Sequence, residues 1–94
     1  SSALAYTPGY APGEQIEQKM EKFGPWTDLY ALGATMYYLL TLQQPPSPTD
    51  IDEKPEEAFA LLQKVSQKTY DLIVWLMKPN RTMRPQNVER MRMG

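Results

Sequence analysis

Apolar residues are most concentrated in residues 28–42, which read DLYALGATMYYLLTL. One stripe at helical spacing is formed by Leu29, Leu32, Met36 and Leu40, and tyrosine and alanine side chains fill the other sides. A helix that is apolar nearly all round belongs in the middle of a fold. At a rise of about 1.5 Å per residue it would be roughly 20 Å long, too short to cross a membrane. We therefore expect a buried central helix over residues 27–42, capped by Asp28 or its neighbour Thr27.

Shorter elements flank this helix. Residues 1–13 contain Pro-Gly punctuation typical of an irregular segment, and residues 14–22 space two apolar side chains four apart, which predicts a short helix. Prolines place a loop at residues 43–51. Further helices are predicted over 52–62, over 66–78 with Ser66 at its start, and over 86–93. No strand-period segment and no repeat is found, so residues 1–94 are expected to form a single, mainly α unit.

Composition narrows the range of functions. The 94 residues carry 10 basic and 11 acidic side chains, a net charge of −1 without long charged blocks, which argues against nucleic acid or membrane partners. Histidine and cysteine are absent from the sequence, which removes the usual catalytic triads and the commonest metal ligands. We expect no catalytic residue and no metal site. The first residues lack the features of a signal peptide, which favours a cytoplasmic location; a membrane-anchored parent protein stays open.

Four motifs occur in a characteristic order. They are TPGYAPGE at 7–14, DLYALG at 28–33, Leu39-Leu40-Thr41 followed by Pro45-Pro46, and Arg84-Pro85. Together they resemble the latter half of the large lobe of a protein serine/threonine kinase of bacterial type, from the end of the activation segment to the last helix. The resemblance covers essentially the whole chain. It implies a partial kinase C-lobe, a helical bundle around the helix at about residues 28–42.

The resemblance also implies roles for individual residues. Thr7, Pro8, Gly9 and Tyr10 would form the shelf that receives the substrate residue after the phosphorylated one. Glu14 and Arg84 would form a buried ion pair, for which arginine is suited because its planar fork grips a carboxylate with two hydrogen bonds. Asp28 would hold the catalytic loop in a whole kinase; because that loop is missing here, capping the helix is its expected role.

Several kinase motifs are missing from the sequence. It has no glycine-rich phosphate loop, no Val-Ala-x-Lys strand, no His-Arg-Asp loop and no Asp-Phe-Gly metal ligand. Phosphoryl transfer depends on these groups. ATP and Mg²⁺ are therefore expected cofactors of the parent kinase and not of this chain, which we expect to be a fragment that provides the shelf and the scaffold. A non-catalytic helical interaction module or a pseudokinase remnant stays open.

Two further expectations concern surfaces. Without the upstream helix and catalytic loop of a whole kinase, part of residues 29–42 should be uncovered, and an exposed apolar patch favours self-association. The parent's protein substrate is the other expected partner. Arg81, Arg84, Arg90 and Arg92 could form an anion-binding patch, but in a nearly neutral chain a solvated face is the favoured interpretation.

Overall fold

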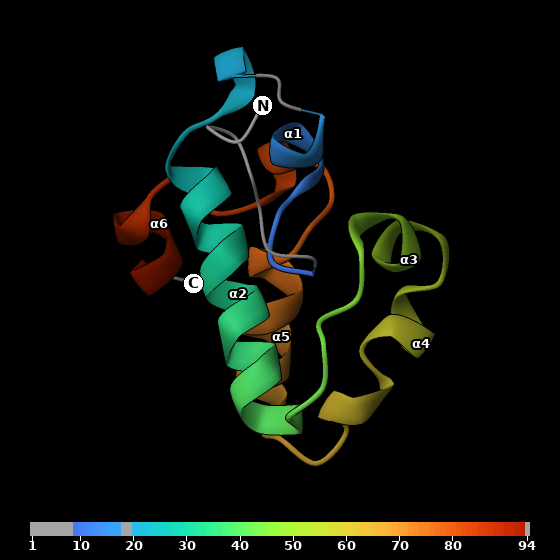
Figure 1. Ribbon diagram of the computed structural model, residues 1–94. Helices are drawn as coiled ribbons and strands as arrows, with labels where there is room; N and C mark the ends of the chain where they lie inside the picture. The colour runs from blue at the N-terminus through green and yellow to red at the C-terminus, as the bar shows by residue number, and fades with distance from the viewer. Residues whose placement is uncertain (1–8, 18–19, 94) are drawn as a thin grey trace.

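The long helix α2, Pro25–Thr41, runs through the middle of the molecule and packs along α5, Gln67–Leu76 (Figure 1). The computed structural model describes residues 9–17 and 20–93. Within those residues the secondary structure is helical without any strand, so the mainly α fold class is confirmed. Across the described residues, no helix is long and apolar enough to cross a membrane.

Helix α2 begins earlier than the sequence pattern indicates, and Asp28 is not its cap. Pro25 occupies the first helical position, where its fixed φ and missing N–H are well tolerated, and Gly24 is the N-cap. Asp28 therefore lies in the fourth position of the helix and is exposed. Thr27 contributes to the helix start, because its Oγ1 accepts a hydrogen bond of 3.2 Å from the Gly24 N–H.

The end of α2 is a strained turn. The residue after the helix, Leu42, has φ 58° and ψ 25°, a left-handed conformation. Glycine is the usual residue at such a helix end, because a Cβ is crowded there. Leu42 is also 71 % exposed, so its side chain gains little packing in return.

The helix expected over 52–62 is instead divided into three short pieces. Helix α3 spans Pro48–Glu53, α4 spans Pro55–Ala58, and the 3₁₀ helix η3 spans Ala60–Leu62. The break falls at Lys54 because the residue before a proline is disfavoured in the α conformation; its φ is −140° and its ψ 67°. Helix α3 starts inside the expected proline loop, where Ser47 Oγ accepts a hydrogen bond of 3.1 Å from the Asp50 N–H.

The helix expected over 14–22 ends early, at Ile16, whereas the two later helices lie close to their expected places. Helix α1 covers Gly13–Ile16 and the 3₁₀ helix η2 covers Met20–Lys22; residues 18 and 19 of the expected helix at 14–22 lie outside the described residues. Helix α5 starts after Ser66, whose Oγ accepts from the Thr69 N–H at 3.2 Å. The 3₁₀ helix η4 covers Arg81–Met83, and α6 covers Val88–Met93, with the Asn87 side chain accepting from the Arg90 N–H.

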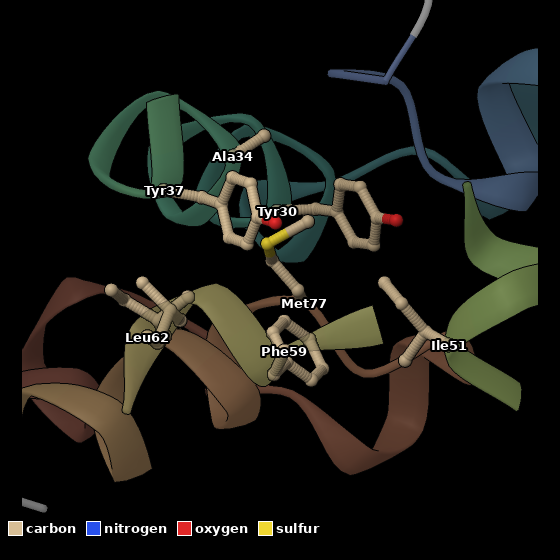
Figure 2. Close-up of a cluster of buried hydrophobic side chains, with 8 residues drawn as sticks. Tyr30, Ala34, Tyr37, Ile51, Phe59, Leu62 and Met77 are labelled. Atoms are coloured by element: carbon tan, nitrogen blue, oxygen red, sulfur yellow. The ribbon is translucent and has the colours of Figure 1, made fainter. Parts of the chain in front are cut away.

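The core forms where α2 meets α5 and the α3–η3 region. Figure 2 shows the rings of Tyr30 and Tyr37, from α2, beside Phe59 and Met77. The cluster of buried side chains consists of Tyr30, Ala34, Tyr37, Ile51, Phe59, Leu62, Ile73 and Met77. The rings of Tyr37 and Phe59 meet edge to face, with centroids 6.4 Å apart. The two long helices approach closely at Gly33, where a Cβ would lie 2.8 Å from Leu76 Cβ.

The opposite side of α2 is open. Leu39 is 68 % exposed, and Leu32, Tyr38, Leu40 and Leu42 are also exposed. The expectation that part of residues 29–42 is uncovered is thus confirmed. Helix α2 is central to the fold but is buried on one side only.

Candidate functional site

The candidate site is built around the side chain of Arg84, which is fully buried. Glu14 lies in the first turn of α1, and Arg84 follows η4, so the two residues come from opposite ends of the chain. Arg84 Nη1 donates to Glu14 Oε2 at 2.7 Å, and Nη2 donates to Oε1 at 3.1 Å. The structure therefore brings Glu14 and Arg84 together as a two-pronged ion pair.

The other N–H groups of Arg84 bind backbone carbonyls. Nε donates to the Lys78 carbonyl at 2.6 Å, Nη2 to the Pro79 carbonyl at 3.0 Å, and Nη1 to the Trp26 carbonyl at 3.2 Å. A guanidinium has five N–H donors, and these three bonds with the two to Glu14 use all of them. Arg84 consequently connects α1, the first turn of α2 and the segment that follows α5.

Helix α2 completes the surroundings of the pair. Thr27 Oγ1 donates to Glu14 Oε2 at 2.9 Å. The ring of Tyr30 lies under the guanidinium, with Arg84 Cζ 4.8 Å from the ring centroid, a cation–π contact. The Tyr30 hydroxyl is buried and has no hydrogen-bond partner among the described residues. The fully satisfied pair thus sits directly beside an unsatisfied polar atom.

Burial and hydrogen bonding act in opposite directions on Glu14. Burial raises the pKa of its carboxyl, but hydrogen bonds from Arg84, from its own backbone N–H and from Thr27, together with the charge of Arg84, outweigh that effect. The net result is a Glu14 pKa below its ordinary value of 4.5. The pKa of Tyr30 is raised, chiefly by burial. At neutral pH the site therefore holds an ionised carboxylate against a guanidinium and a neutral phenol.

The predicted substrate shelf is described only in part. Thr7 and Pro8 lie outside the described residues. Gly9 has φ 87° and approaches the loop after α2 so closely that a Cβ would lie 2.9 Å from the Pro45 carbonyl oxygen. Tyr10 is partly buried and packs against the core cluster. The described part of the predicted shelf, Gly9 and Tyr10, therefore packs against the loop that follows α2 and against the core. Tyr10 lies four residues before Glu14.

The described residues offer few candidates for metal binding or catalysis. Among the described residues, no group of three or more Asp, Glu, His or Cys side chains is placed to hold a metal ion. The Glu14–Arg84 pair is saturated with internal partners, which leaves neither side chain free to bind a ligand. The arrangement is suited to fixing segments relative to one another.

Comparisons with known proteins bear on the fold. No protein-family model matches the sequence, and no curated protein matches it. A solved structure, "PpkA-294 apo form", resembles the chain with a TM-score of 0.69 and 30 % sequence identity over 93 % of this chain. The fold is kinase-like. The chain spans 31 % of the length of the PpkA-294 chain that it resembles.

Sequence reasoning missed most of the partners of Arg84. The carbonyls of Trp26, Lys78 and Pro79 carry no side-chain signal, so no residue pattern reveals them. Thr27, a partner of Glu14, was expected from the sequence as the alternative cap of the central helix, and it takes part in the helix start through the hydrogen bond that it accepts from the Gly24 N–H. Its second hydrogen bond, to Glu14, depends on the tertiary fold.

Proposed function

We propose that this chain is part of a serine/threonine protein kinase, comprising the end of the activation segment and the large-lobe helices that follow it. The parent enzyme would transfer the γ-phosphate of ATP to serine or threonine hydroxyls of a protein substrate. This part would supply the substrate-binding shelf and the helical scaffold. The observation that carries the proposal is the buried Glu14–Arg84 pair, which joins the two ends of a kinase-like fold.

The position of Gly9 and Tyr10 supports the shelf assignment. A shelf must hold the backbone of a substrate in a fixed place, and flexible loops do this poorly. Gly9 is wedged against Pro45, and Tyr10 is held by the core. Glu14, four residues farther on, is tied down by Arg84. These contacts would hold residues 7–10 in a fixed position relative to α2 and α5. A substrate backbone bound there would then also be held in a fixed position.

The chain would bind substrate without performing phosphoryl transfer. Catalysis of that reaction requires groups that position ATP and Mg²⁺, and the corresponding motifs do not occur in this sequence. In the parent, such groups would come from other parts of the protein. ATP and Mg²⁺ would then be cofactors of the parent only.

The proposal is tested on the gene and on its complete product. We expect the reading frame to continue upstream through a lysine strand and a His-Arg-Asp loop, and the complete product to label a serine- or threonine-containing protein with radioactive ATP. Arg84→Lys should lower that labelling, and Lys64→Arg, at an exposed position in the turn before α5, should not. A reading frame that begins at Ser1, or a complete product that transfers no phosphate, would contradict the proposal.

The open face of α2 favours a second candidate, a helical interaction module derived from a kinase and without catalysis. Leu32, Leu39, Leu40 and Leu42 are 41–71 % exposed, and exposed apolar patches of this kind commonly bind a partner. Helix α2 carries no charged residue between Leu29 and Thr41, so a second copy would meet no like-charge repulsion there. Self-association through this face is the corresponding proposal.

Sedimentation velocity tests the self-association. We expect the chain to sediment as a dimer or larger species, and Leu39→Glu to shift it toward the monomer, because the charge would be buried at the contact. Val88→Glu is the matched control, since Val88 is 54 % exposed and begins α6, where an acidic side chain is favourable to the helix. A monomer that binds no apolar dye would contradict the self-association without affecting the kinase proposal.

A further inference from the structure

A groove lies between α5 and α6. In Figure 1, α6 lies on the opposite side of α2 from α3 and α4. Two cavities of about 580 and 590 Å³ share Trp75 as part of their walls. Apart from Thr69, the half-buried side chains of the groove are apolar, and its exposed side chains include three cations. We refer to this set as the Trp75 groove: Leu72, Trp75, Met91, Lys68, Arg90 and Arg92.

The charges of the groove are unbalanced. Lys68, Arg90 and Arg92 are exposed, and among the described residues none of them forms an ion pair with a carboxylate. The one acidic side chain in the lining is Asp71, whose Oδ1 accepts a hydrogen bond of 2.8 Å from Gln67. The groove therefore attracts anionic groups and offers them cations that are not already neutralised.

A solvated face of basic side chains would account for the cations of the groove. It does not account for the apolar side chains beside them. Leu72, Trp75 and Met91 are half-buried and line the groove, so a ligand in the groove would cover their exposed parts. A tryptophan in a concave site with apolar neighbours is a common anchor point for a protein partner. Cations surrounding such a surface would favour a partner that combines carboxylates with a large apolar side chain.

We propose that the Trp75 groove binds an acidic peptide segment of another protein. An apolar or aromatic side chain of the peptide lies on Trp75, and carboxylates on either side pair with Lys68, Arg90 and Arg92. A second copy of this chain is a poorer occupant. Its acidic stretch at 50–57 contains one large apolar side chain, Ile51, which is buried in the core. This proposal does not depend on the kinase assignment.

A labelled hexapeptide tests the proposal. Fluorescence anisotropy of fluorescein-labelled Asp-Glu-Leu-Phe-Glu-Asp is measured against the whole chain at low and at physiological salt. We expect saturable binding that weakens with salt, because exposed charges are screened. Asp-Glu-Ser-Gly-Glu-Asp, which keeps the charges and lacks the apolar pair, should bind at least about tenfold more weakly, since burying a large apolar side chain is worth more than 1.4 kcal/mol, one factor of ten.

A matched pair of variants locates the site. Lys68→Glu should weaken binding about tenfold or more, because it replaces an attraction by a repulsion in the groove. Lys68 lies in the first turn of α5, where an acidic residue is favourable to the helix, so unfolding does not explain a loss of binding. Lys64→Glu makes the same charge change at an exposed position outside the groove and should leave binding within about twofold.

Other outcomes would overturn the proposal. They are absence of binding, equal loss from Lys68→Glu and Lys64→Glu, or equal affinity for the two peptides. Tighter binding of a single-stranded oligonucleotide than of the acidic peptide would also overturn it, because base stacking on Trp75 would then explain the groove. Self-association of the chain that is lost in Lys68→Glu but kept in Lys64→Glu, measured by sedimentation velocity, would assign the groove to a second copy instead.

Discussion

The guanidinium of Arg84 grips the carboxylate of Glu14 with hydrogen bonds of 2.7 and 3.1 Å across 70 residues of sequence. Both side chains are almost completely buried. Because Arg84 also binds three backbone carbonyls, the contact joins α1, the first turn of α2 and the segment that follows α5. The stability of the whole chain should therefore depend on it.

Removing the guanidinium should destabilise the fold strongly. Arg84→Ala leaves the Glu14 carboxylate buried without its counter-ion, which costs about 3–5 kcal/mol in comparable pairs. Arg84→Lys keeps the charge but loses the fork geometry, so its cost should be smaller but still measurable. Urea unfolding followed by circular dichroism gives both values. Arg92→Ala, at an exposed position, is the control and should change the free energy of unfolding by less than about 0.5 kcal/mol. Equal stability of Arg84→Ala and Arg92→Ala would show that the pair does not support the fold.

The pair should also make stability depend on acid pH. The folded-state pKa of Glu14 is lowered from 4.5, so its contribution to stability is fully present above pH 4.5. As the pH falls below that value the unfolded chain takes up the proton first, and the contribution is lost as the pH passes through the folded-state pKa. Urea midpoints of the wild type and of Glu14→Gln, measured from neutral pH downward, should differ most at neutral pH and converge in acid. A difference that stays constant across this range would contradict the lowered pKa.

The close contact between α2 and α5 at Gly33 predicts whether an alanine there raises or lowers the stability of the fold. Alanine is the better helix former by about 1 kcal/mol, but a Cβ at Gly33 would lie 2.8 Å from both Leu76 Cβ and Met77 Cγ. Overpacking of this kind typically costs about 1–3 kcal/mol, so Gly33→Ala should be destabilising in total. Gly13→Ala is the matched control, because no atom lies within 4 Å of a Cβ there, and it should be neutral or stabilising. If both variants gained stability, the close packing of the two helices would be refuted.

Leu42 offers the reverse case, in which glycine should stabilise the protein. Its φ of 58° places a branched side chain in the left-handed region, which costs roughly 1–2 kcal/mol relative to glycine. Leu42→Gly should raise the melting temperature by several degrees, given about 4–8 °C per kcal/mol for a chain of this size. Leu39→Gly, inside α2, should lower it by removing a good helix former. A lower melting temperature for Leu42→Gly would indicate that its side chain contributes packing.

The main features of the fold could be read from residue patterns. The apolar run at 28–42 predicted the central helix, which the structure places at Pro25–Thr41, and Ser66 marked the start of α5. The contact between Glu14 and Arg84 came from the resemblance to kinases and not from any local pattern, because 70 residues separate the two.

Other features were settled by effects that the pattern does not reveal. The expected helix at 52–62 is broken because the residue before Pro55 avoids the α conformation. Asp28 is displaced from the cap because Pro25 begins the helix three positions earlier. The carbonyl partners of Arg84 depend on the path of the chain after α5, which only the tertiary structure defines. The Trp75 groove arises from the docking of α6 beside α5, and each of its residues taken alone is an ordinary surface residue.

A calorimetric titration of Mg²⁺-ATP into this chain tests the central claim most directly. If the chain supplies a kinase shelf and scaffold and leaves the nucleotide chemistry to other parts of the parent, no saturable binding should be detected at millimolar nucleotide, although the chain is folded and Arg84→Ala is destabilised. Saturable binding of Mg²⁺-ATP by these 94 residues alone would contradict that division of roles.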